Sequence, residues 1–305
     1  MQSPSLYNNL ATLLFNSPAN DSGSASASPG ASGATEADGV KAIQDATHVE
    51  VVVAAMRKHA EDAELQQKAC MTLQSMNTGN EDFEAKAGNA GAVEAVVAAM
   101  RTHIEDTELQ WAACLALLRM NIGNADNRAK AGTDAANRVE AGNAGAIDAV
   151  VAAMQGHREH TELQRAACSS LGQITNGNAA NRVKAGNAGA IDAVVAAMQG
   201  HREHTELQQV ACMTLSHMNT NNANNRTKAG IAGAIDAVVV AMQGHREHAE
   251  LQRAACMSLF RITTNNADNR AKAGTAGAID AVVVAMQGHI EHAELQLAAC
   301  RCCFS

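Results

Sequence analysis

Apolar residues recur at helical spacing along most of this 305-residue chain. The stretch "AIDAVVAAMQG", residues 146–156, predicts a short amphipathic helix ended by its glycine, because its apolar residues lie three or four positions apart and so share one face. The residues on this face are Ile147, Val150, Val151 and Met154.

A longer amphipathic pattern follows after a polar connection. Thr161 and Gln164 stand at the spacing of a capping box, and Glu162 lies in the first turn, where the helix dipole favours an acid. We therefore predict another helix over residues 161–174, "TELQRAACSSLGQI", with Thr161 as its N-cap. Its apolar stripe is formed by Leu163, Ala167, Cys168, Leu171 and Ile174.

The two patterns recur together in register. The methionine that ends "VVAAM" or "VVVAM" is followed fourteen residues later by a cysteine each time, and successive copies lie 44 residues apart, with one exception of 54. A short Ala-rich piece such as "ADNRAKAG" comes before the pair and predicts a helix of one or two turns closed by glycine. The methionines are Met56, Met100, Met154, Met198, Met242 and Met286.

Residues 41–305 are therefore expected to form about six three-helix units, the last of them incomplete. Ten extra residues near 133–142 account for the long spacing. We expect them to lengthen a first helix or to loop out, and to bend the stack between the second and third units; unbroken stacking there would contradict the bend. Residues 1–40 are rich in Ser, Ala and Gly with little to bury, which predicts a disordered leader.

The recurring pattern "NR…AG…AI…VV…M" followed by "LQ…AC…L" resembles the armadillo repeat over roughly residues 41–305. Individual copies resemble the variant repeats of vacuolar and protist armadillo proteins. The resemblance implies an all-α, right-handed α-solenoid whose third helices line a concave groove. It also implies a non-catalytic scaffold that binds partner proteins or peptides. HEAT repeats are the alternative, but their units have two helices and lack the short first one.

The copies differ mainly within the third helix. Three columns of residues, spaced by four, are expected to share its exposed groove face. The predicted groove residues are Gln67, Met71, Ser75, Trp111, Leu115, Arg119, Arg165, Ser169, Gln173, Gln209, Met213, His217, Arg253, Met257 and Arg261, with Leu297 and Arg301 in the last unit.

The groove columns contain no Asp or Glu, although the chain is acidic overall, and Lys68 lies beside them. This composition predicts that the groove binds an acidic or phosphorylated segment, with methionines as an adaptable apolar floor and Trp111 as the strongest anchor. The Trp and Asn ladders with which importin alpha grips basic nuclear-localisation peptides are absent, so that mode of binding is not supported. The alternative is that these exposed positions have simply drifted since the units were duplicated.

Paired histidines in the "HREH" connections are candidate metal ligands: His157, His160, His201 and His204. Zinc sites usually need three or four protein ligands, and successive copies are expected about 10 Å apart, too far to share one ion. A solvated connection is the simpler interpretation.

The recurring cysteines are interpreted as small buried apolar residues of a reducing compartment rather than as disulfides.

The last four residues, "CCFS", have the form of a prenylation signal on Cys302. The alternative to a simple scaffold is therefore a membrane-tethered adaptor that is lipidated at Cys302. No basic run precedes this end, and the last unit stops here without a polar cap.

Composition narrows the function further. A net charge of −8 and an aromatic content of 2% make nucleic acid an unlikely partner. The sequence contains no P-loop, dinucleotide fingerprint, "HExxH" or nucleophile beside a base, which indicates neither an enzyme nor a cofactor. No apolar stretch is long enough to span a membrane, and we expect a cytoplasmic location, with the nucleus as the alternative.

Overall fold

The computed structural model describes residues 48–76, 87, 89–120, 138–139 and 141–303. The predicted leader and most of the ten-residue insertion lie outside these residues. The described helices are α3 (His48–Lys58), α4 (Ala63–Met76), α6 (Ala92–Thr102), α7 (Thr107–Met120), α9 (Ala146–Gly156), α10 (Thr161–Thr175), α11 (Ala179–Asn187), α12 (Ala190–Gly200), α13 (Thr205–Asn219), α14 (Ala223–Ile231), α15 (Ala234–Gly244), α16 (Ala249–Thr263), α17 (Ala267–Thr275), α18 (Ala278–Gly288) and α19 (Ala293–Cys303).

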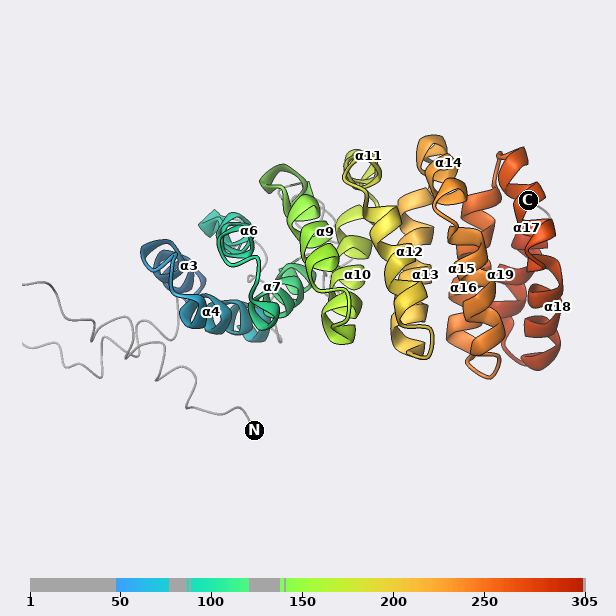
Figure 1. The fold of residues 1–305 in the computed structure, drawn as a ribbon, viewed down its shortest axis with the longest axis horizontal. Coiled ribbons are helices and arrows are strands. Elements are labelled where there is room, and N and C mark those ends of the chain that lie inside the picture. Colours follow the sequence, from blue (N-terminus) through green and yellow to red (C-terminus); the bar gives the residue numbers. More distant parts are fainter. Residues whose placement is uncertain (1–47, 77–86, 88, 121–137, 140, 304–305) are drawn as a thin grey trace, which may run out of the picture.

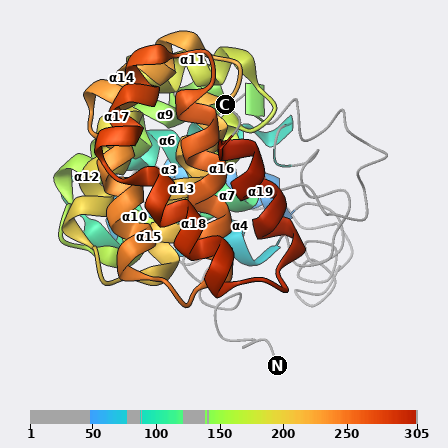
Figure 2. The same ribbon diagram turned by 90° about the vertical axis from the view of Figure 1, so that its right-hand side faces the viewer.

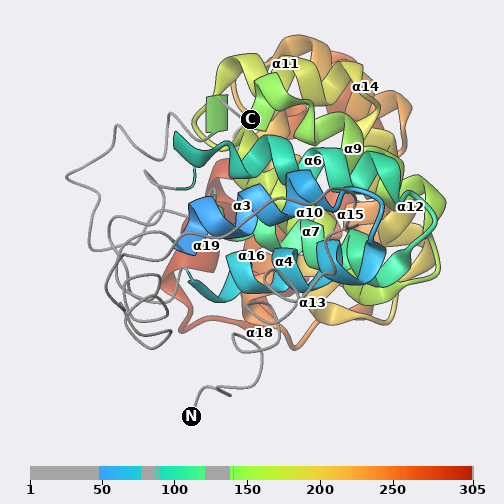
Figure 3. The same cartoon turned by 90° about the vertical axis from the view of Figure 1, so that its left-hand side faces the viewer.

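The helices form rows that run along an elongated stack (Figure 1). Third helices pack on third helices and second helices on second helices, while α11, α14 and α17 follow one another along one edge. Views along the stack show the second-helix row and the third-helix row on opposite sides, with the first helices along one edge (Figures 2 and 3). The third-helix row consists of α4, α7, α10, α13, α16 and α19.

The core lies between the two rows and is built almost entirely from aliphatic residues, Ala, Met and Cys. The predicted apolar face of α9 is buried, and the stripe of α10, from Leu163 to Ile174, is fully buried. Small side chains such as Ala167 let neighbouring helices approach closely, so the core needs few aromatic residues. The predicted burial pattern of the second and third helices is confirmed.

A close contact fixes the distance between successive first helices. Asn269 of α17 lies directly over Gly230 of α14, where a Cβ atom would come within 1.8 Å of the Asn269 Oδ1. The Asn269 amide donates to the carbonyl oxygens of Arg226 and Ile262, at 2.7 and 3.0 Å. Asn225 makes the same contact over Gly186 one unit earlier. The glycine is therefore required by packing between units.

The predicted N-cap of the third helix is wrong by one residue. His160 caps α10, and its Nδ1 accepts from the backbone N–H of Leu163 at 3.0 Å. Gln164 does not complete a capping box. Its amide donates instead to the carbonyl oxygens of Met154 and His157, at 2.8 and 2.9 Å, and so ties the end of the preceding helix to this one. The last carbonyl groups of a helix have no hydrogen-bond partner within the helix, and the buried Gln164 amide supplies a donor to two carbonyls at the end of α9.

The stack continues across the inserted residues. Helix α7 packs on α10, and α6 packs on α9, as the other neighbouring pairs do. The Thr107 hydroxyl lies 2.9 Å from the Nδ1 of His157, and the equivalent Thr161–His201 distance in the next interface is 3.1 Å. The expected bend is therefore contradicted, because the same contacts join these units as join the others.

Five of the six recurring cysteines are buried, as predicted, and all the described cysteines are free thiols. Burial raises the pKa of Cys70, Cys168 and Cys212 to about 12. The sixth, Cys300, is exposed, and this part of the prediction is wrong.

The thiols should therefore differ sharply in reactivity. Under native conditions at neutral pH, iodoacetamide should modify Cys300 and Cys303, which are exposed, and the buried thiols on the order of a hundredfold more slowly. Mass spectrometry of digests at successive times checks this. Rapid native labelling of Cys212 would contradict the packing, and labelling after unfolding in urea is the control.

Candidate functional site

The structure places the predicted groove residues together on the outward side of the third-helix row. Every one of them is at least partly exposed, and Met71, at 38% exposure, is among the most open. Because neighbouring third helices are in direct contact, these positions form one continuous surface from α4 to α19. We call it the third-helix face.

Trp111 is less available than expected. Its ring is half-buried and packs against the core. The indole Nε1 is buried, with no hydrogen-bond partner among the described residues. Trp111 therefore contributes to packing as well as to the surface, and replacing it would disturb both.

The predicted columns themselves contain no acid, but a row of glutamates lies directly beside them. Each third helix carries a glutamate in its first turn, one turn before the first predicted column. Glu162 pairs with Arg165 at 2.7 Å, and Glu250 pairs with Arg253 at 2.9 Å. The hydrogen bond from Arg165 is the main reason why the pKa of Glu162 lies below its usual value. The acidic column consists of Glu64, Glu108, Glu162, Glu206, Glu250 and Glu294.

The histidines proposed as metal ligands are used in contacts between units. His157 Nε2 donates to the carbonyl oxygen of Ile104 at 2.8 Å, and its Nδ1 accepts from the Thr107 hydroxyl. His201 repeats both contacts, with Arg158 and Thr161.

The capping histidines face the acidic column instead. His204 caps α13 through Nδ1, and its Nε2 lies 3.5 Å from Glu162 of the preceding unit. His160 faces Glu108 in the same way, at 3.8 Å. Within the described part of the chain, no three His, Cys, Asp or Glu side chains are grouped to hold a metal ion.

The other end of the third-helix face is basic. His217 of α13 donates from Nδ1 to the carbonyl oxygen of Gly172 at 3.2 Å. Burial lowers the pKa of His217, and the guanidinium groups of Arg182, Arg138 and Arg261 lower it further. Three successive units therefore bring cations close together here.

Arg182 of α11 and Arg226 of α14, which lies near Arg261, were not among the predicted site residues. Arg182 Nη1 donates to the carbonyl oxygen of Thr175, and Arg226 Nε to that of Asn219, both at 3.3 Å. Their side chains are only 8% and 9% exposed. A signal was available in the sequence: arginine recurs in the "NR" of several first helices, and neither Arg182 nor Arg226 has an acid three or four residues away.

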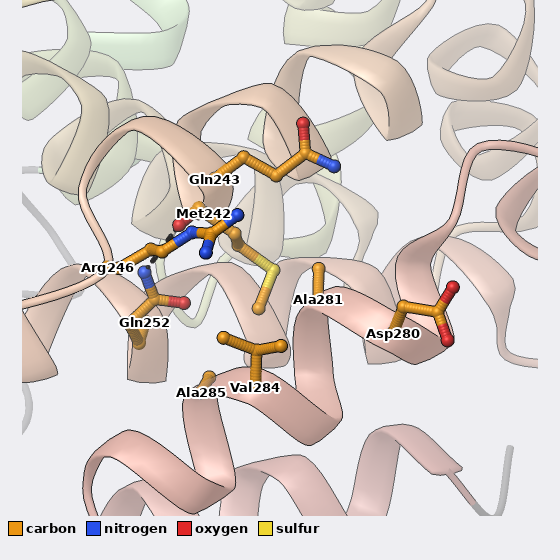
Figure 4. Close-up of a pocket in the computed structure, with 8 residues that line it drawn as sticks. All are labelled: Met242, Gln243, Arg246, Gln252, Asp280, Ala281, Val284 and Ala285. Atoms are coloured by element: carbon orange, nitrogen blue, oxygen red, sulfur yellow. Dashed lines mark hydrogen bonds between the residues drawn. The ribbon is translucent and has the colours of Figure 1, made fainter.

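Among the described residues, hollows with volumes of about 90 to 230 Å³ lie between successive second helices on the opposite side of the stack. The one between α15 and α18 has a volume of about 90 Å³ and lies between Met242, Arg246 and Gln252 on one side and Asp280 and Val284 on the other. Figure 4 shows the Asp280 carboxylate pointing away from the Arg246 guanidinium. Binding pockets usually combine a larger volume with convergent polar groups, so these hollows are not strong candidates.

The lipidation candidate Cys302 lies in the last turn of α19 and packs against the core. Burial, together with Cys303, raises the pKa of its thiol to about 12. The final Phe and Ser of the motif lie outside the described residues.

Comparison with known proteins identifies the repeat. Residues 43–305 match the family model described as the LRRK2 ARM repeat. No curated protein matches the chain.

Several solved structures with the same arrangement are engineered proteins. An engineered protein from the Northeast Structural Genomics Consortium is 23% identical, with a TM-score of 0.68 over 83% of this chain and 96% of its own. A second engineered protein from that consortium is 22% identical, with a TM-score of 0.72 over 87% of this chain and 59% of its own. A designed armadillo repeat protein in complex with the peptide (KR)4 is 20% identical, with a TM-score of 0.67 over 84% and 98%. At these identities the likeness shows the fold, and the predicted solenoid of three-helix units is confirmed.

Proposed function

The chain belongs to the armadillo repeat family, and from that premise we propose that it is a non-catalytic scaffold that binds extended segments of partner proteins along its third-helix face. A stack of this kind offers a long continuous surface rather than an enclosed pocket. One structural neighbour, the designed armadillo repeat protein, was solved with a bound peptide, which supports this use of the fold.

The observation that carries the proposal is where the units differ. The nineteen letters from 146–164 and 190–208 are identical, and their apolar residues build the core. The residues that follow on the third-helix face differ: Ser169 is replaced by Met213, and Gln173 by His217. A shared scaffold with a different surface in each unit suits recognition of a segment with a defined order of side chains.

The electrostatics of the face refine the predicted partner. Glutamates occupy the N-terminal end of the third helices, and Arg165 and Arg253 are neutralised by them. The unneutralised positive charge lies at the other end, near His217 and Arg261. A partner whose acidic or phosphorylated group reaches that end therefore fits better than one that is acidic throughout.

Site-specific photo-crosslinking tests the proposal. A photoreactive amino acid at Gln209, on the third-helix face of α13, should crosslink partner proteins in lysate. The same residue at Gln199, exposed on α12 of the same unit, should crosslink few or none. Both sites replace a glutamine, and mass spectrometry identifies the products. Equal yields at the two positions, or a yield from Gln199 alone, would refute binding along the third-helix face.

The lipidated adaptor is not favoured by any contact, since the Cys302 thiol packs against the core. Among the described residues, none of the helices has the length and apolar character needed to cross a membrane. The proposal includes a cytoplasmic or nuclear location, which the free buried thiols support because such thiols are typical of reducing compartments.

A further inference from the structure

We propose that the basic end of the third-helix face is a binding site for a phosphate group carried on a segment of a partner protein. The inference rests on the proposed scaffold function and names the chemistry of its partner. The site, which we call the arginine site, consists of Arg182, His217, Arg226 and Arg261.

Two positive charges of the arginine site are buried without a counter-ion among the described residues. Arg182 and Arg226 are more than nine-tenths buried, and burial lowers the pKa of both guanidinium groups. No ion pair in the described residues joins either of them to a carboxylate. Buried charges in proteins are normally paired or bind an ion. Their contacts with carbonyl oxygens at 3.3 Å use only part of each guanidinium's five N–H donors.

Basic side chains from four helices converge on the arginine site. Arg182 comes from α11 and Arg226 from α14, while His217 and Arg261 occupy the same position in successive third helices. Arg182 and Arg261 both lie near enough to His217 to lower its pKa, and Arg261 does the same to Arg226. Like charges repel, so bringing them together costs free energy that a bound anion would recover.

Arg261 supplies an unsatisfied donor. Its Nε is buried and has no hydrogen-bond partner among the described residues. The guanidinium carbon lies 5.1 Å from the centre of the Phe260 ring, and this contact steadies the group. A planar guanidinium binds phosphate oxygens in pairs through neighbouring N–H groups.

The surroundings favour a single phosphate on a protein over a nucleic acid. Glu206 and Glu250 stand at the opposite ends of α13 and α16, eleven residues from His217 and Arg261, or about 16 Å along each helix. A long polyanion across the face would meet this acidic column. Phosphate is favoured over carboxylate because its charge approaches two and its three oxygens can accept from several guanidinium groups at once.

Binding of inorganic phosphate tests the site without assuming a partner sequence. The full chain, titrated with phosphate against chloride at constant ionic strength, should show a saturable rise in melting temperature. Arg261→Gln should weaken phosphate binding about fivefold or more. The matched control is Arg253→Gln, which removes the same charge from the same helix two turns earlier, where Glu250 already neutralises it. It should change binding less than about twofold.

Equal losses in the two variants would mean that only net charge matters, and this result would overturn the site. The absence of any saturable phosphate effect in the wild type would overturn it as well. Arg182→Lys is a second variant, which keeps the charge but loses the planar fork. It should give an intermediate loss, and circular dichroism establishes that each variant is folded.

The source of the phosphate is tested with three probes: a degenerate peptide library centred on phosphoserine, the same library with serine, and vesicles containing phosphatidylserine. Tighter binding of the phosphoserine library by about tenfold or more, lost in Arg261→Gln, supports the proposal. Binding of the vesicles alone would overturn the assigned partner.

The two proposals can fail separately. If phosphate binding fails while crosslinks from Gln209 persist, the scaffold function stands without the arginine site. If phosphate binds but Gln209 gives no crosslinks, the scaffold function is overturned.

Discussion

Replacing Gly230 by alanine should destabilise the chain by about 2–3 kcal/mol, although alanine is the better helix former by about 1 kcal/mol. The new methyl group would overlap the Oδ1 of Asn269, whose position is fixed by two hydrogen bonds to backbone carbonyls. Moving Asn269 aside would leave buried polar groups without partners, which adds to the cost of the overlap.

Gly274 is the matched control, because it occupies the same position one unit later and has nothing within 4 Å of where its Cβ would lie. Gly274→Ala should leave stability unchanged or raise it by up to about 1 kcal/mol. Urea unfolding followed by circular dichroism measures both variants. A loss of stability in Gly274→Ala equal to that in Gly230→Ala would show that helix propensity or backbone conformation, and not the contact with Asn269, explains the glycine.

The helices and their buried faces were predictable from sequence because burial in an amphipathic helix follows a fixed spacing, and the repetition of the units tested that spacing several times over. The 44-residue period also indicated that equivalent residues of successive units lie side by side. Residues such as Ile147 and Leu163 are buried for this reason, with exposures of 1% and 0%.

The caps and the charged contacts were not predictable to the same degree. His160 and Thr161 are adjacent, and both have side chains able to accept a hydrogen bond, so the spacing of apolar residues does not decide which one caps α10. The prediction chose Thr161 because a threonine three residues before a glutamine is the commoner motif. The side chain of Gln164 binds carbonyl groups of the preceding helix instead, a contact that depends on how the two helices cross.

The ion pairs on the third-helix face, and the arginines that first helices add to it, were not predicted for a related reason. The predicted columns in this helix begin at Arg165. Glu162, one turn earlier, was interpreted only as an acid favoured by the helix dipole, but its carboxylate pairs with Arg165. Arg182 belongs to the following first helix, and only the folding of the chain brings it to the same face. The spacing of residues along one helix cannot reveal the charged side chains that other helices bring to the same face.

The second large effect concerns the interface between second helices. Helices α15 and α18 have the same eleven-letter sequence, "AIDAVVVAMQG", yet Ile235 is 2% exposed and Ile279 is 65% exposed. Ile235→Ala should lower the free energy of unfolding by about 2–4 kcal/mol, because it opens a cavity where α15 packs against its neighbours. Ile279→Ala should cost less than about 1 kcal/mol, since most of that side chain remains in contact with water.

Because the two helices are identical in sequence, the change in helix propensity is the same in both variants and cancels in their difference. What remains is the packing between units, which a stack held together by nearest-neighbour contacts uses in place of a single central core. Urea unfolding gives the overall loss, and hydrogen exchange of the α15 amides shows whether it is local to that interface. Equal losses in the two variants would mean that Ile279 is covered in solution, and the exposed position described for it would then be wrong.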